Sequence, residues 1–169
     1  QRLGLHGAHV VKVEPPYGDA QRNIQDGVQF SCVNRGGKQS LSVDLKTERG
    51  ARLVGELAST ADVVVESFRP GVLERFDLDY ESVAATNEDV IYCSITGFGQ
   101  DGPRSAYPSF DSIIQAASGL MSLTGYPDRD PVRIGTTVID YSTAANAAFA
   151  VSAAIRQRDR RGCGEHIDI

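Results

Sequence analysis

Residues Ala61–Phe68 read ADVVVESF, and this stretch decides the fold class. Three successive valines predict a β-strand, because β-branched side chains favour extended backbone. The run is nearly all apolar and does not alternate, which is typical of a strand that is covered on both faces in a parallel sheet. A second stretch of this kind, Asp89–Gly99 (DVIYCSITGFG), ends in a glycine-rich loop. Together the two stretches predict a buried parallel core.

Helical and extended patterns alternate on either side of these two strands. Helices are predicted in Thr47–Thr60, with Thr47 as N-cap, in Phe110–Gly125, and from Asp140 to near Arg158. Further strands are predicted at Ala8–Glu14, at Ser40–Leu45 and at the final residues HIDI. This alternation indicates an α/β fold of the Rossmann-like kind, a mostly parallel sheet with helices on both faces. In such sheets, ligands bind beyond the carboxyl ends of the strands.

Composition excludes several classes of function. The 169 residues carry a net charge of −5 with no basic tail, which argues against binding to nucleic acid or to an anionic membrane. No apolar run approaches the ~20 residues that span a bilayer. Three dispersed cysteines without a CxxC motif favour a reducing compartment, the cytoplasm, and give no sign of a metal site. The chain lacks an initial Met and closes on an incomplete strand, so we expect a piece of a longer protein.

Two aspartates stand where helices are predicted to begin. Asp140 opens the long alanine-rich segment and Asp111 opens the preceding helix. The ordinary interpretation of each is an N-cap, whose carboxylate accepts backbone N–H groups of the first turn. The alternative for Asp140 is a nucleophile, because helix-end N–H groups can keep a carboxylate ionised and ready to attack a carbonyl. The pattern alone does not choose between the two.

Aromatic and basic side chains follow the Ala61–Phe68 strand. Phe68, Arg69 and Arg75 suit a ligand with an adenine ring and phosphates, since arginine binds phosphate and stacks on rings. Lys46, just beyond another predicted strand, is a candidate phosphate partner. A solvated turn around Pro70-Gly71 is the alternative interpretation. The glycines in GFGQDGP (97–103) permit close approach of a ligand but match neither a P-loop nor a GxGxxG fingerprint.

An ordered set of motifs resembles the CoA-transferase family III, which includes formyl-CoA transferase and carnitine CoA-transferase. The matching stretches, in chain order, are GAHVVKVEPPYGD, NRGGKQSLSVDLKTERG, ADVVVESFRPGVLERF, VIYCSITGFGQDGP, FDSIIQAASGLMSLTG, PVRIGTTVIDYSTA and GCGEHIDI. The resemblance covers nearly all of residues 1–169. It implies that they form part of a large domain, without the family's first strand and helix and without its smaller domain.

The resemblance also implies roles for particular residues. Asp140 is implied as the catalytic nucleophile, with Asp111 as the second acid of the catalytic site. The residues implied to bind CoA are Val43, Asp44, Leu45, Lys46, Ser67, Phe68, Arg69, Arg75, Pro108, Ser109 and Phe110. Two features depart from the family pattern. Ser67 replaces a common asparagine, and the NRGGK loop is one residue longer, which leaves contacts from Arg35 or Lys38 open.

The activity implied is transfer of CoA from an acyl-CoA to a carboxylic acid. It would pass through an aspartyl anhydride and an aspartyl-CoA thioester, without a metal or a permanently bound cofactor. An interlocked homodimer is implied as the assembly. Because the family's glycine loop over the site lies outside these residues, residues 1–169 alone are expected to be inactive.

Two rival functions stay open at this point. An α-methylacyl-CoA racemase shares the fold and uses acid–base chemistry, but its histidine falls at Phe110, and phenylalanine cannot move protons. A non-catalytic nucleotide-binding or CoA-binding fragment is the other rival. In that case Ala8–Glu14 would be the second strand of a dinucleotide fold, with Glu14 as the acid that binds ribose.

Overall fold

The structure is a computed structural model, and it describes residues 1–23 and 37–169. Most of the loop predicted between Gly18 and Lys38, including Arg35, lies outside the described residues. The described elements, in chain order, are α1 (Arg2–Leu5), β1 (Val10–Glu14), η1 (Ala20–Asn23), β2 (Lys38–Ser42), α3 (Glu48–Ala58), β3 (Val63–Glu66), η3 (Leu73–Phe76), α4 (Tyr80–Ala84), β4 (Ile91–Ser94), α5 (Asp111–Ala117), η4 (Leu120–Leu123), α6 (Val138–Arg161) and β5 (Glu165–Asp168).

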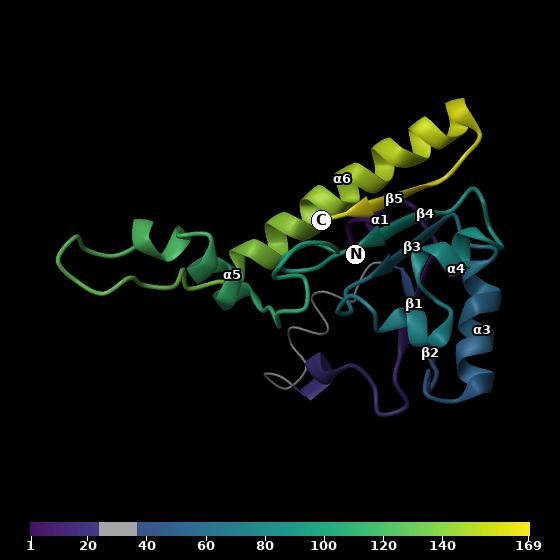
Figure 1. The fold of residues 1–169 in the computed structure, drawn as a ribbon, viewed down its shortest axis with the longest axis horizontal. Coiled ribbons are helices and arrows are strands. Elements are labelled where there is room, and N and C mark those ends of the chain that lie inside the picture. The colour runs from purple at the N-terminus through teal and green to yellow at the C-terminus, as the bar shows by residue number, and fades with distance from the viewer. Residues whose placement is uncertain (24–36) are drawn as a thin grey trace.

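Every strand pair in the described part of the chain is parallel, as predicted. The strands form two sheets, β1–β2 and β3–β4–β5 (Figure 1). In the larger sheet Glu66, Ser94 and Asp168 are register partners at the carboxyl ends of the three strands. The loops that follow these strands therefore leave the sheet at one edge, which is where α/β folds bind ligands.

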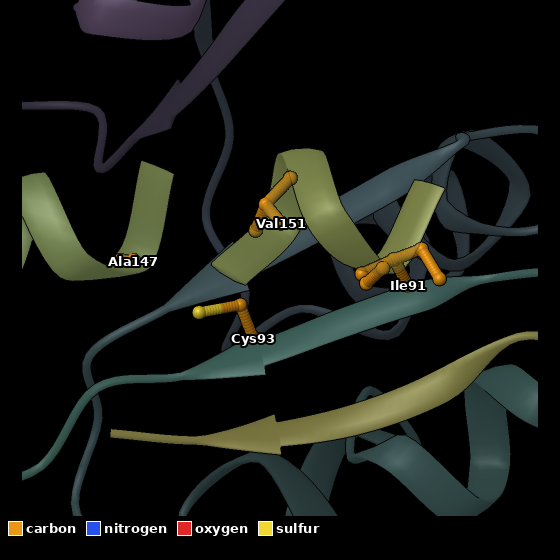
Figure 2. Close-up of a cluster of buried hydrophobic side chains, with 5 residues drawn as sticks. Ile91, Cys93, Ala147 and Val151 are labelled. Atoms are coloured by element: carbon orange, nitrogen blue, oxygen red, sulfur yellow. The ribbon is translucent and has the colours of Figure 1, made fainter. Parts of the chain in front are cut away.

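Strand β4 forms the centre of the core and is buried along its whole length. Ile91 and Cys93 point toward Ala147 and Val151 of α6, as Figure 2 shows. On the opposite face, a second cluster joins Tyr92 and its neighbour Val90 to Ala58 of α3 and Val83 of α4. Alternate side chains thus enter two different cores, so the prediction of helices on both faces is confirmed.

The opening stretch, Ala61–Phe68, does form a strand, but the prediction that it is buried on both faces is wrong. Val65 in β3 is 52% exposed, whereas Ile91 and Cys93 of β4 are wholly buried. The reason is position, because β3 is an edge of the three-stranded sheet and only β4 has a strand on each side. An apolar run predicts a strand without predicting its place in the sheet.

Two helix predictions had different outcomes. Thr47 is the N-cap of α3, since its hydroxyl oxygen accepts a hydrogen bond from the Gly50 N–H at 3.1 Å, as predicted. The helix predicted over Phe110–Gly125 is instead interrupted. Helix α5 ends at Ala117, and Gly119 takes a left-handed conformation (φ 80°) before the short η4 turn. Glycine adopts this conformation without strain, so it ends the helix.

A buried carboxylate, Glu14, organises the end of β1. It is 3% exposed and receives Arg22 at 2.9 Å, the Ser40 hydroxyl at 3.1 Å and the Asp19 N–H at 3.1 Å. Burial acts to raise the pKa of Glu14, but these donors and Lys12 outweigh it and hold the pKa below its usual value. This carboxylate is therefore bound on several sides by the chain's own groups.

Helix α6 is longer than the sheet on which it packs. Its last turns lie at the amino ends of β3 and β4, where Arg158 pairs with Asp62 at 3.0 Å. A helix of 24 residues is about 36 Å long, so its first turns run past the opposite edge of the sheet, toward α5 (Figure 1). Among the described residues, α6 alone is long and apolar enough to cross a membrane. Length and composition alone meet this criterion, and α6 packs on β4 through Ala147 and Val151.

Candidate active site

Asp140 lies in the first turn of α6 but is not its N-cap. The helix begins at Val138, and Thr137 holds the cap position without a side-chain hydrogen bond. Asp140 is the third helical residue and is exposed to solvent. The N-cap prediction for Asp140 is therefore wrong, because the helix starts two residues earlier than the acid. The position leaves its carboxylate available to a ligand.

Asp111 supplies the missing cap from the neighbouring helix. One oxygen of its carboxylate, Oδ2, accepts hydrogen bonds from the N–H groups of Ile139 at 2.8 Å and Asp140 at 3.1 Å. Asp111 is 8% exposed and is the first residue of α5, whose own cap position is Phe110. The prediction that Asp111 caps its own helix is wrong. Its side chain instead satisfies donors at the start of α6, which have no partner within that helix.

Sequence analysis missed a third member of this group, Gln115. This side chain is fully buried, and its amide nitrogen donates to Asp111 Oδ1 at 2.5 Å and to the Thr136 carbonyl at 3.3 Å. Its amide oxygen accepts from the Ile134 N–H at 2.9 Å. The available signal was the spacing of Asp111 and Gln115, since residues four apart share one face of a helix. A polar pair on one face of a short helix indicates a buried network.

The electrostatics of Asp140 differ from the sequence-based expectation. Loss of hydration raises the pKa of Asp140, and the negative charge of Asp111 raises it further. The helix-end N–H groups expected to stabilise the Asp140 anion face Asp111 instead. The two acids thus have different environments: Asp111 is buried and bound by donors, and Asp140 is exposed and more basic than an ordinary aspartate.

Three of the residues implied to bind CoA line one cleft. Leu45, Lys46 and Arg75 meet in a cleft of about 730 Å³ between the start of α3 and the η3–α4 segment. Arg52 of α3 adds a third basic side chain, and Glu48, Glu56 and Asp77 also line the cleft. Lysine and arginine are the side chains that bind phosphate, so this cleft can hold an anionic ligand. None of its lining residues comes from α5 or α6, which carry the two aspartates.

The other implied CoA residues lie in two places. Ser67, Phe68 and Arg69 are exposed just beyond β3, and the Phe68 N–H donates to Glu66 Oε2 at 2.7 Å. Val43 is buried and its N–H donates to the Glu14 carbonyl at 2.8 Å, so its side chain belongs to the core. Asp44 fixes the following turn, since its Oδ1 accepts from the Lys46 N–H at 3.0 Å.

The segment before α5 packs on the glycine loop that follows β4. A Cβ atom added at Gly97 would lie 2.1 Å from Cβ of Ser109, so this close approach requires glycine. Pro108 and Phe110 flank this contact and are exposed, Phe110 by 73%. Further along the loop, the Gln100 N–H donates to Asp168 Oδ2 at 2.8 Å. The segment that leads to Asp111 is therefore tied to the carboxyl edge of the sheet.

The histidines of the chain lie elsewhere. His166 in β5 is bonded to Ser94 at 2.9 Å and stacks on Tyr80, with ring centroids 4.7 Å apart. His9 is bonded to Gln39 at 2.8 Å. Over residues 1–23 and 37–169, no three side chains of the metal-binding types gather into a candidate metal site. The chemistry available at the start of α6 is that of two carboxylates and an amide.

Comparison with known proteins places the chain in a family. The chain is 41% identical to a succinate–glutarate CoA-transferase of Agrobacterium fabrum, over 100% of the chain and 45% of that protein. It is 41% identical to an acetyl-CoA:oxalate CoA-transferase of Acetobacter aceti, over 96% of the chain and 43% of that protein. The chain spans about half the length of the curated relatives it matches.

Solved structures agree with this comparison. A CAIB/BAIF family protein from Brucella suis matches 99% of the chain and 47% of its own, at 43% identity and a TM-score of 0.94. Rv3272 from Mycobacterium tuberculosis matches 98% of the chain and 46% of its own, at 36% identity and a TM-score of 0.91. The family model described as CoA-transferase family III matches residues 1–169. The chain therefore belongs to CoA-transferase family III.

Proposed function

We propose that the protein to which this chain belongs transfers CoA from an acyl-CoA to a carboxylic acid, with Asp140 as the nucleophile. The observation that carries the proposal is the contrast between the two acids. Asp140 is exposed at a helix start and has a raised pKa, whereas Asp111 is buried and occupied by donors. A more basic, accessible carboxylate is the better nucleophile. The names of the relatives support the reaction class, since each is called a CoA-transferase.

The reaction balances through four exchanges at acyl carbons. An oxygen of Asp140 attacks the thioester carbonyl, the C–S bond breaks, and CoA leaves as its thiolate. The thiolate attacks the Asp140 carbonyl of the anhydride, which releases the donor acid and forms an aspartyl-CoA thioester. The acceptor carboxylate then attacks that thioester, again releasing the thiolate. Attack of the thiolate on the acceptor's acyl carbon yields the new acyl-CoA and restores Asp140. Covalent catalysis divides one difficult transfer into easier steps.

We propose that the cleft at Lys46 and Arg75 holds the phosphates of CoA. Both side chains are exposed and line the same 730 Å³ space. The exposed Phe68 and Arg69, beyond β3, suit the adenine ring and its neighbouring phosphate. Asp140 would receive the thioester end. CoA is long enough for a nucleotide site and a reacting end to be separate, which fits two groups of residues on different elements.

Removing one phosphate ligand tests this assignment. Arg75→Ala in the full-length enzyme is expected to raise KM for acyl-CoA about tenfold with little change in kcat, because a charge-assisted contact to phosphate is lost. Steady-state kinetics measure both constants. Arg160→Ala, at the distant end of α6, is the matched control and should leave both unchanged. An unchanged KM in Arg75→Ala would remove this arginine from the CoA site.

The raised pKa of Asp140 predicts the pH dependence of the reaction. The nucleophile must be ionised, and an acid with a raised pKa binds its proton at a higher pH than free aspartate, whose pKa is ~3.9. Consequently kcat/KM should fall as the pH falls, with its acid midpoint above that value. The pH profile of the full-length enzyme measures this midpoint. A profile that stays flat down to the ordinary range of aspartate would contradict the assignment.

An exchange assay tests the reaction class. The full-length enzyme is incubated with a panel of acyl-CoA donors and dicarboxylic acids, and new acyl-CoA is measured by chromatography. Transfer to an acceptor acid is the expected result. If no pair exchanges but the α-proton of a branched acyl-CoA exchanges in deuterated water, the racemase reaction is correct instead. Phe110, which is 73% exposed and lacks an ionisable group, argues against that outcome.

The dinucleotide-binding alternative has an observation against it. Glu14, which would bind a ribose, is 3% exposed and is held by Arg22, Ser40 and the backbone of Asp19. A carboxylate that already accepts these hydrogen bonds has few acceptor sites left for a ligand hydroxyl. Tight binding of NAD without binding of CoA would reverse this conclusion.

We also propose an interlocked homodimer in the cytoplasm. Support comes from large apolar side chains that are exposed on the arm after α5 and along α6, namely Leu123 at 84%, Tyr126 at 68%, Tyr141 at 60% and Phe149 at 76%. Apolar surface of this kind marks a contact with further chain or a second copy. Within the described residues Cys93 and Cys163 are free thiols, which suits a reducing compartment. A monomeric mass of the full-length protein by light scattering would contradict the dimer.

A further inference from the structure

The first turns of α6 contact α5 but bury none of their own side chains fully. Its buried residues are Ala147, Val151 and Ala154, all at least one turn beyond the start of the helix. No residue from Val138 to Asn146 is buried. A helix end that buries no side chain fully frays readily, because its backbone groups can bond to water instead. The position of Asp140 therefore depends on whatever holds the start of α6.

Gln115 lies at the base of the segment that joins α5 to α6. The chain leaves α5 and runs outward through η4 as an arm (Figure 1). It returns to α5 at Ile134, whose N–H donates to the Gln115 side chain. The Gln115 side chain bonds to both ends of this path, since it contacts Asp111 in α5 and also Ile134 and Thr136 on the return. The Gln115 side chain that makes these bonds has no exposure to solvent. It thereby closes the base of the arm.

Asp111 completes the connection from Gln115 to Asp140. Its Oδ1 faces the Gln115 amide and its Oδ2 faces the N–H groups of Ile139 and Asp140. With one oxygen held by Gln115, the carboxylate cannot rotate without losing a bond at the other oxygen. The orientation of the α6 start is therefore coupled to the Gln115 amide through a chain of buried and partly buried hydrogen bonds.

We propose that Gln115 is a positioning residue of the active site, which fixes the Asp111 carboxylate and through it the helix turn that carries Asp140. This inference rests on the proposed function, because it assigns Gln115 a role in the reaction of Asp140. Glutamine suits the role since it both donates and accepts. Methionine matches its size without these bonds, and glutamate can donate to Asp111 only when it is protonated.

The test uses the full-length enzyme with Q115M and Q115E. Q115M is expected to lower kcat about 10- to 100-fold, as a misplacement of about 1 Å does, with KM for acyl-CoA unchanged. In Q115E, the introduced carboxyl lies beside Asp111, so its pKa is expected to rise. The ratio of the kcat of Q115E to the kcat of Q115M should therefore increase as the pH falls. The protonated carboxyl restores one donor to Asp111. Q157M, at the far end of α6, is the control and should retain wild-type kcat.

Each outcome has one meaning. A wild-type kcat in Q115M would overturn the proposal. So would equal loss in Q115M and Q115E at every pH, or loss of the folded circular dichroism spectrum in both, because Gln115 would then serve folding alone. Asp140→Ala is measured alongside. If that variant stays active, the proposed function itself fails. If it is inactive while Q115M is normal, only the role of Gln115 fails.

Discussion

Asp140→Ala in the full-length enzyme is expected to lower transferase turnover about 10⁴-fold or more, as removal of a covalent nucleophile does in other enzymes. Alanine has no atom that can form the anhydride. The fold should survive, because Asp140 is exposed in a helical turn and alanine is a good helix former. A discontinuous assay of acyl-CoA exchange measures the loss of turnover. A melting curve of the same sample checks that the variant is folded.

Asp140→Asn separates charge from shape at this position. Asparagine is nearly the size of aspartate, so substrate binding should be retained while turnover is lost. Ser142→Ala, two residues along the same exposed turn, is the control, since its hydroxyl bonds only to the Ile139 carbonyl, at 2.9 Å, among the described contacts. Turnover close to wild type in either Asp140 variant would mean that another group attacks the thioester.

Asp111→Asn is expected to lower kcat about 10- to 100-fold, through loss of orientation at Asp140. The buried carboxylate accepts from Gln115 and from two N–H groups of α6. The asparagine amide has only one acceptor oxygen. Its NH₂ group must therefore face either the Gln115 donor or the two backbone donors of α6, and it cannot accept from them. Part of this network is then broken, and the cap of α6 is weakened by about 1 kcal/mol.

Asp111→Asn is also expected to change the pH dependence of the reaction. Asp111→Asn removes the negative charge that helps to raise the pKa of Asp140. The acid midpoint of kcat/KM should therefore move to lower pH even as kcat falls. A pH profile of the variant measures both effects. A lower kcat with an unmoved midpoint would show that Asp111 acts only on structure, and an unchanged kcat would remove it from the site.

The sequence predicts the positions of helices and strands better than their burial or their order in the sheet. The β-branched and apolar runs placed β1, β3 and β4, and the breakers placed the loops, because these signals are local. The burial of β3 could not be predicted in the same way, since Val65 is exposed through its place at the sheet edge. Strand order is set by contacts between distant segments, which a local pattern does not encode.

The candidate site shows the same limit. The sequence indicated Asp111 and Asp140 as acids at helix starts, and both are there, but the ordinary interpretation of each as the cap of its own helix is wrong. The actual bond crosses from α5 to α6, over a separation of 28 or 29 residues. Gln115 was missed for the same reason, because its partners Ile134 and Thr136 are far along the chain. Polar networks between elements require the fold to be known.

The central claim is that Asp140 forms a covalent bond to an acyl carbon, and trapping the intermediate tests it most directly. The full-length enzyme is mixed with acyl-CoA, quenched with hydroxylamine, digested and analysed by peptide mass spectrometry. Hydroxylamine displaces CoA from an aspartyl thioester and leaves a hydroxamate. The account predicts a hydroxamate on Asp140 in the active enzyme and none in Asp140→Asn. An enzyme that turns over normally with Asp140 unmodified, or with the label on another carboxylate, would contradict it.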